Sequence, residues 1–218
     1  TKVIKKDTVV GVCWGKSIHS CISQVKPNNF LPITVVQLLG DMIKENRMVE
    51  SKQLTNMLAT KYNGKFKYLN LPLYINDAEL REKILSEPIV KSTIDVAKKC
   101  NMIITGIGGE TSLPIHNKDF IAYLSDNDKK NKHQIGSIFG RVIDEDGNIC
   151  DMDINNKISG IDFESILKAE RRVGIVYGKH KVRVTLAALK KRLVNTIITD
   201  RTTSIMMLRE LNILEDDI

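Results

Sequence analysis

Long apolar runs are missing from this sequence of 218 residues. No stretch approaches the roughly 18 to 20 apolar residues that are needed to cross a bilayer. The basic start, Thr1 to Lys6, leads into a short strand-like run rather than a cleavable signal sequence. We therefore expect a cytoplasmic protein with no membrane partner.

Cysteine is scarce, and its spacing carries no motif. Cys13, Cys21, Cys100 and Cys150 show neither a CxxC pair nor a companion histidine pattern. This argues against a zinc site and against a disulfide scaffold. We expect no bound metal and no cofactor.

Aromatic residues make up only 5% of the chain, and they seldom lie among the basic residues. The formal net charge is +7, which suits a nucleic acid, an anionic ligand or solubility alone. The lysines and arginines are dispersed, with little aromatic interleaving and no helix-turn-helix module, so a solvated surface is favoured over a nucleic-acid patch. DNA binding by this chain itself is not expected.

The most informative stretch is Val9-Val10-Gly11-Val12-Cys13-Trp14-Gly15-Lys16-Ser17. An apolar run starting at Val9 breaks at Gly15 and is followed by an amphipathic segment, Ile18 to Val25, which indicates strand, tight turn and helix. The free N–H groups and the positive end of such a helix, helped by Lys16 and Ser17, form a seat for an anion such as phosphate.

Strands and helices alternate along the rest of the chain. Further strands are expected at 31–37, 67–71, 102–105, 136–144, 172–177 and 196–199, and helices at 51–62, 77–85, 87–99, 117–124, 162–169, 182–193 and 202–211. Residues 126–133 are expected to be an exposed charged loop, 145–148 a hairpin-type turn, and 149–161 show no assignable pattern. The alternation predicts one α/β domain over 1–218 with a largely parallel sheet.

In such sheets the ligand crevice lies beyond the carboxyl ends of the strands. Those ends carry Gly15, Lys16, Ser17, Gln37, Gly106, Gly108, Lys181 and Asp200. Several glycine turns and polar groups on one sheet edge favour a phosphate or phosphosugar site.

Three enzyme classes are alternatives. A nucleotide triphosphatase would fit Gly15-Lys16-Ser17, but only three residues separate Gly11 from Gly15 where the phosphate loop needs four. A sugar-phosphate isomerase would need a base and an acid, for which Glu110 and His180 are candidates without a supporting spacing. A coenzyme A transferase has only Glu110 as a hint. We assign no catalytic residue.

The ordered motifs resemble the sugar-binding effector domain of the sorbitol-operon regulator (SorC) family of bacterial transcription regulators, which are relatives of the DeoR regulators. The resemblance covers nearly the whole chain. It rests on the stretch from Val10 to Ser17, Val36-Gln37-Leu38-Leu39-Gly40, Leu71-Pro72, Gly106-Ile107-Gly108, Ile135 to Gly147, Gly178 to Lys181, Ala187-Ala188-Leu189 and Ile197-Ile198-Thr199-Asp200.

This resemblance implies a Rossmann-like fold, similar to the glucosamine-phosphate and ribose-phosphate isomerases, that senses a phosphorylated sugar without transforming it. It implies that Gly15, Lys16 and Ser17 grip the phosphate, Lys181 pairs with it, Gln37 contacts the sugar, and Asp200 ends the last strand. A homodimer or homotetramer is implied, with DNA contacted through an N-terminal helix-turn-helix domain that we expect to be missing before Thr1.

The sequence departs from the family pattern at three places. Tyr177-Gly178 stands where two glycines are usual, Ser17 where threonine is usual, and Lys157 near a usual arginine. These departures bear on the sugar preference of the pocket.

Overall fold

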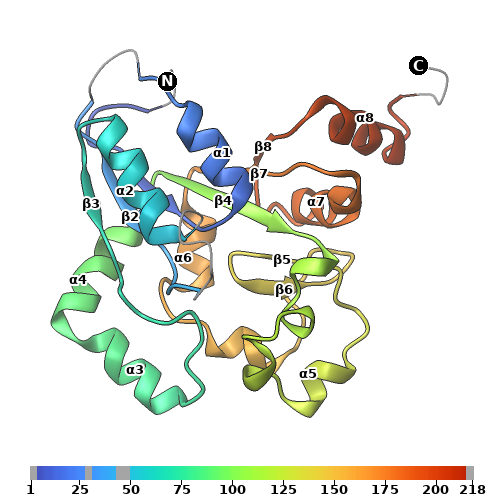
Figure 1. Cartoon of the computed structure of the whole chain (residues 1–218), viewed down its shortest axis with the longest axis horizontal. Coiled ribbons are helices and arrows are strands. Elements are labelled where there is room, and N and C mark those ends of the chain that lie inside the picture. The colour runs from blue at the N-terminus through green and yellow to red at the C-terminus, as the bar shows by residue number, and fades with distance from the viewer. Residues whose placement is uncertain (1–3, 28–30, 43–49, 215–218) are drawn as a thin grey trace.

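A computed structural model describes residues 4–27, 31–42 and 50–214 (Figure 1). The strands are β1 (Val9–Val12), β2 (Thr34–Gln37), β3 (Lys65–Lys67), β4 (Met102–Gly108), β5 (Gly136–Ile138), β6 (Arg141–Ile143), β7 (Arg171–Ile175) and β8 (Thr196–Ile198). The helices are α1 (Lys16–Gln24), α2 (Ser51–Lys61), α3 (Ala78–Ser86), α4 (Pro88–Ala97), α5 (Asp126–Lys130), α6 (Phe163–Lys168), α7 (Val182–Lys190) and α8 (Arg201–Glu210). Short 3-10 turns are η2 (Glu110–Ser112), η3 (Pro114–His116), η4 (Ile121–Tyr123), η5 (Asp153–Lys157) and η6 (Lys179–Lys181).

A parallel sheet in the order β3-β2-β1-β4-β7-β8 forms the centre of the molecule. The last two residues of β4 pair antiparallel with β5, which continues into β6. The chain runs outward from β1 to β2 and β3, and then restarts at β4 on the other side of β1. The strand order therefore reverses between β1 and β4, which is where open α/β sheets bind their ligands.

The central strands of the sheet are buried. Val10 and Val12 of β1 and Val35 and Val36 of β2 are all fully buried, as expected of a central parallel pair. Figure 1 shows α1 and α2 side by side at one end of the molecule and α7 with α8 at the other. The predicted α/β class and the mostly parallel sheet are confirmed. In the described ranges no helix has the length and apolar character that a bilayer crossing requires.

The predicted loop at 126–133 is wrong, because α5 occupies Asp126–Lys130. Ser125 and Asp128 form a reciprocal capping box, which starts a helix without any apolar periodicity. The fully buried Asp128 carboxylate also accepts hydrogen bonds from the backbone N–H groups of Asp153 (2.7 Å) and Ile154 (3.2 Å). Capping and a tertiary contact thus fix this helix.

The predicted single strand at 136–144 is a hairpin instead. Phe139 and Gly140 have φ values of 51° and 74°, and the chain reverses there between β5 and β6. This left-handed pair is the geometry of a two-residue hairpin turn. The expected turn at 145–148 does form, held by Asp144, whose carboxylate accepts from the N–H groups of Asp146 and Asn148.

Several other boundaries differ from the prediction, and two of the differences have a clear local pattern. The strand expected at 67–71 is β3 at Lys65–Lys67, because the Leu69 N–H bonds to the side chain of Gln37 instead of continuing the ladder. The helix expected at 117–124 is reduced to the single 3-10 turn η4. The segment 149–161, for which no pattern was found, contains η5.

Candidate functional site

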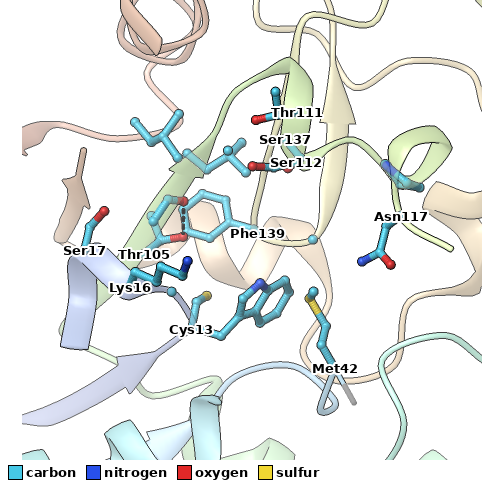
Figure 2. Close-up of a pocket in the computed structure, with 18 of the residues that line it drawn as sticks. Cys13, Lys16, Ser17, Met42, Thr105, Thr111, Ser112, Asn117, Ser137 and Phe139 are labelled. Atoms are coloured by element: carbon cyan, nitrogen blue, oxygen red, sulfur yellow. Dashed lines mark hydrogen bonds between the residues drawn. The ribbon is translucent and has the colours of Figure 1, made fainter. Parts of the chain in front are cut away.

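A cavity of about 770 Å³ opens beyond the carboxyl ends of β1, β4 and β7 (Figure 2). These three strands are neighbours, since β4 pairs with β1 on one side and with β7 on the other. Six of the eight predicted site residues line the cavity: Gly15, Lys16, Ser17, Gly106, Gly108 and Lys181. The predicted convergence of strand ends is therefore observed for these residues.

The start of α1 faces the cavity without a capping side chain. Gly15 precedes the helix with φ 143° and ψ 153°, a conformation that side chains disfavour. By contrast, Asp77, Ser125, Asp162 and Asp200 cap α3, α5, α6 and α8 with side-chain oxygens. The first N–H groups of α1 remain available to an anion, which the helix dipole also favours.

The end of β4 supplies the second part of the wall. Gly108 lies so close to η2 and β5 that a Cβ there would approach Ser137 Oγ to 2.7 Å and Ser112 Cβ to 3.0 Å. Only glycine lets both serines reach the cavity at this point. In Figure 2, Thr111, Ser112 and Ser137 lie together, opposite Cys13 and Met42. Thr105, deeper in β4, donates from its hydroxyl to the Gly106 carbonyl at 3.1 Å.

The loop after β7 brings in Lys181. Gly178, with φ 105°, turns the chain into η6, and Lys181 follows at the start of α7. Partial burial lowers the pKa of the Lys181 ammonium, and within the described residues it forms no ion pair. A cation that is partly desolvated and unpaired favours an anionic partner.

Charged side chains around the cavity are mostly basic. The lining includes Lys16, Lys118 and Lys181, whereas Asp119 is the one carboxylate among the described lining residues. The resulting positive potential in a concave site attracts anions.

An aromatic wall completes the cavity. Trp14, Tyr74, Phe120 and Phe139 line it, and the last three are 5%, 7% and 1% exposed. Burial raises the pKa of the Tyr74 hydroxyl above its usual range. It also raises the pKa of the Cys13 thiol to about 12, so this cysteine is a neutral wall residue rather than a nucleophile.

Gln37 does not lie in the cavity. Its side chain is fully buried, donating to the Leu39 carbonyl (2.9 Å) and to Asp41 Oδ1 (3.0 Å) and accepting from the Leu69 N–H (3.1 Å). All of these partners belong to the loops that follow β2 and β3. The structure therefore places Gln37 outside the cavity lining, where it joins these two loops, rather than in the sugar contact that the resemblance implied.

Asp200 is also outside the cavity lining. It is the N-cap of α8 and accepts from the Thr203 N–H at 3.0 Å and from the Thr203 hydroxyl at 2.5 Å. Thr203 Oγ1 in turn accepts from the Gly178 N–H at 2.9 Å. Asp200 thus fixes the loop that carries Lys181, and these hydrogen bonds lower its pKa.

The arrangement of residues around the cavity gives little support to the enzyme alternatives. Gly11 lies inside β1, so the stretch before Lys16 is too short to wrap a triphosphate. His180 lines the cavity, but Glu110 is exposed at the start of η2 and outside the lining. In the ranges that the structure describes, no group of three or more His, Cys, Asp or Glu side chains is placed to hold a metal ion.

Sequence reasoning missed several lining residues. Asn117, Ser112 and Ser137 sit on turns and a short strand whose order in space depends on the hairpin at Phe139 and Gly140. Gly140 was the local signal, because an isolated glycine inside a strand pattern indicates an interruption of that strand.

A family model described as "Putative sugar-binding domain" matches residues 1–209. The chain is 27% identical over 212 residues to the uncharacterized transcriptional regulator YjhU of Escherichia coli K12, covering 95% of this chain and 63% of that protein. It is 23% identical over 212 residues to the deoxyribonucleoside regulator of Bacillus subtilis, covering 96% of this chain and 67% of that protein. The chain thus spans about two thirds of these relatives' length.

Solved structures show the same fold. The full-length sorbitol operon regulator SorC of Klebsiella pneumoniae matches with a TM-score of 0.82 at 20% identity, covering 94% of this chain and 67% of that one. A transcriptional regulator of Streptococcus pneumoniae matches with a TM-score of 0.85 at 20% identity, covering 97% of this chain and 81% of that one. These proteins are named as regulators, and none of them is named for an enzyme activity.

Proposed function

Because the chain belongs to the sugar-binding domain family of SorC- and DeoR-type transcriptional regulators, we propose that its cavity binds a phosphorylated sugar as an effector. The sugar is sensed and released unchanged. The observation that carries this proposal is the uncapped start of α1, with Lys16 beside it and the unpaired Lys181 on the neighbouring loop of one cavity.

The phosphate lies at the start of α1 in this proposal. The N–H groups after Gly15 and the Ser17 hydroxyl donate to its oxygens, while Lys16 and Lys181 balance its charge. The glycines Gly106 and Gly108 keep the β4 end open beneath the sugar, so that Ser112 and Ser137 reach its hydroxyl groups. Polar groups of this kind orient a ligand inside a cavity that is otherwise apolar.

Regulation follows by population shift. A phosphosugar that binds one conformation of this domain better than another changes the balance between them, and only differential affinity can do so. We place the domain in a homodimer or homotetramer of a larger cytoplasmic regulator, which contacts DNA through a separate domain. A purified domain that stays monomeric with and without its ligand would contradict this part of the proposal.

A thermal-shift panel tests the proposal. Phosphorylated sugars, their unphosphorylated parents and inorganic phosphate are compared with the wild-type chain and with Lys181→Ala and Ser17→Ala. A ligand at a hundredfold excess over its dissociation constant stabilises the folded state by about 2.7 kcal/mol. The proposal predicts a selective shift by one phosphosugar, which is reduced in both variants.

Recovery of the ligand separates sensing from catalysis. After incubation, the phosphosugar is expected to be recovered unaltered, as judged by NMR. Its conversion to an isomer would instead support an isomerase. If no ligand in the panel shifted the melting temperature, the proposed phosphate site at the start of α1 would be contradicted.

A further inference from the structure

The aromatic wall has no role in binding a phosphate. Trp14, Tyr74, Phe120 and Phe139 line the same cavity as Lys16, on a chain in which aromatic residues make up only 5%. Trp14 directly precedes Gly15, so the indole and the uncapped start of α1 are two parts of one turn. Trp14 and the start of α1 therefore line the same cavity and are adjacent in the chain.

The Trp14 indole contacts the hairpin turn between β5 and β6. A Cβ at Gly140 would lie 3.3 Å from Cη2 of Trp14, so the backbone of this turn packs against the six-membered ring. Tyr74 contacts the same turn, with its hydroxyl 3.4 Å from the Gly140 carbonyl. Its ring meets Phe120 edge to face, with centroids 5.1 Å apart. The wall is thus built before a ligand arrives.

Hydrogen-bonding groups occupy the other sides of the cavity. Figure 2 shows Ser112 and Ser137 along one side and Asn117 at the end away from Lys16, with Phe139 between Asn117 and Lys16 in this view. The side-chain oxygen Oδ1 of Asn117 accepts from the Asp119 N–H at 3.0 Å, which leaves the side-chain NH₂ to donate. Neither serine hydroxyl hydrogen-bonds to another described residue, so both are available to a ligand.

A closed sugar ring fits a cavity that has aromatic side chains on one side and hydrogen-bonding groups on the others. Its C–H groups form a flat, weakly positive face that complements the negative face of an indole, and its hydroxyl groups project from the rim. An open-chain polyol offers no such face, and binding it also costs the entropy of its many rotatable bonds, which a closed ring has already lost. The aromatic wall therefore distinguishes two forms that carry the same phosphate.

We propose that the cavity selects the ring-closed form of a phosphorylated sugar, with the ring stacked on Trp14. This inference rests on the proposed function and narrows its ligand class to pyranose or furanose phosphates. In this proposal Lys16 and Lys181 bind the phosphate, whereas Trp14 contacts the face of the sugar ring.

The test compares an aldose phosphate with its alditol phosphate, which keeps the same carbon chain and phosphate but cannot close a ring. The aldose phosphate giving the largest thermal shift is titrated beside the alditol phosphate made from it by borohydride reduction, and beside inorganic phosphate. Calorimetry is expected to give a dissociation constant at least about tenfold lower for the aldose phosphate than for the alditol phosphate. Because Trp14 is the single tryptophan of the chain, its fluorescence is expected to change with the aldose phosphate and to change little with inorganic phosphate.

Variants of Trp14 provide the matched control. Trp14→Phe retains an aromatic face and is expected to keep the preference for the ring, whereas Trp14→Leu is expected to abolish it. Should Trp14→Leu fail to fold, the wild-type ligand ratio and the fluorescence signal still decide the question.

The outcomes separate the two proposals. Equal affinity for aldose and alditol phosphates, or tighter binding of the alditol phosphate, overturns ring selection and leaves phosphosugar sensing intact. Binding that is insensitive to the phosphate, with no loss in Lys181→Ala, overturns the proposed function itself.

Discussion

The ammonium nitrogen of Lys181 lies 5.5 Å from the centroid of the Tyr177 ring, and both side chains line the cavity. Tyr177 occupies one of the two positions where the related family usually has glycine. Gly178 alone supplies the left-handed turn, with φ 105°. The tyrosine therefore takes over a position beside the charged end of the site, where its ring partly covers the lysine without neutralising it.

Removing the Lys181 charge is expected to weaken phosphosugar binding. Lys181→Met keeps most of the aliphatic stem and removes the cation, so we expect a roughly ten- to hundredfold rise in the dissociation constant, the usual range for a hydrogen bond to a charged group. Affinity for the unphosphorylated parent sugar should stay within about twofold, because no charge is involved. Calorimetry of both ligands measures the difference, and equal losses for both would contradict the assigned role.

Phosphosugar affinity should depend on pH through the same residue. Burial lowers the pKa of Lys181 from its ordinary value of 10.5, so the free protein loses this cation at a lower pH than an exposed lysine would. Affinity is expected to fall as the pH rises through that lowered pKa, and also below about pH 6, where the phosphate itself takes up a proton. The decline on the alkaline side should be absent in Lys181→Met, and its persistence there would assign the titration to another group.

Gly15→Ala tests the backbone turn in front of α1. A Cβ at this position meets nothing within 4 Å, so the expected cost comes from the φ of 143° alone. We expect a loss of about 1–2 kcal/mol in unfolding free energy and weaker binding of inorganic phosphate. Chemical denaturation and phosphate titration measure the two effects. Ser17→Ala, which leaves the backbone unchanged, should cost little stability.

Gln37→Leu should show whether Gln37 stabilises the fold or contacts the ligand. The substitution leaves the Leu69 N–H and the Leu39 carbonyl buried without their partner, so we expect a loss of roughly 2–3 kcal/mol in unfolding free energy. The dissociation constant of the phosphosugar, measured below the melting transition, should change by less than about threefold. A variant that is as stable as wild type but no longer binds would restore the sugar contact implied by the sequence resemblance.

Asp200 is expected to show its role in the pH dependence of stability. Hydrogen bonds from the Thr203 hydroxyl and N–H hold its folded-state pKa below the ordinary value of 3.8. Its contribution is therefore present above the unfolded-state pKa and is lost as pH falls through the lowered pKa. Asp200→Asn keeps a capping oxygen that does not titrate, so its melting temperature should approach that of wild type as the pH falls from about 5 to about 3. A constant difference would contradict this.

Much of the fold follows from local patterns. The β1 run, the turn at Gly15 and α1 could be predicted because apolar periodicity, a glycine and a helical face occur within a few residues of one another. The parallel sheet followed from the alternation of such units. The predictions for α5 and for the β5–β6 hairpin failed because a capping box around Asp128 and a left-handed pair at Phe139-Gly140 outweigh the hydrophobic pattern there.

The candidate site was predictable only in part for a similar reason. Gly15, Lys16 and Ser17 lie just after β1 and Lys181 lies in the loop after β7, and neighbouring parallel strands bring such segments together. Gln37 also ends a strand, but its side-chain amide is occupied by hydrogen bonds to Leu39 and Asp41 after β2 and to Leu69 after β3, a loop that is distant in sequence. The aromatic wall arises from residues as far apart as Trp14 and Phe139, whose meeting depends on tertiary packing.

The most direct test of the central claim is a calorimetric titration of the best-binding phosphosugar and its unphosphorylated parent into the wild-type chain and Lys181→Ala. The account predicts that the phosphorylated sugar binds wild type at least about a hundredfold more tightly than its parent does, and that Lys181→Ala removes most of this difference. Equal affinity of the two sugars for wild type would contradict the phosphate seat at α1.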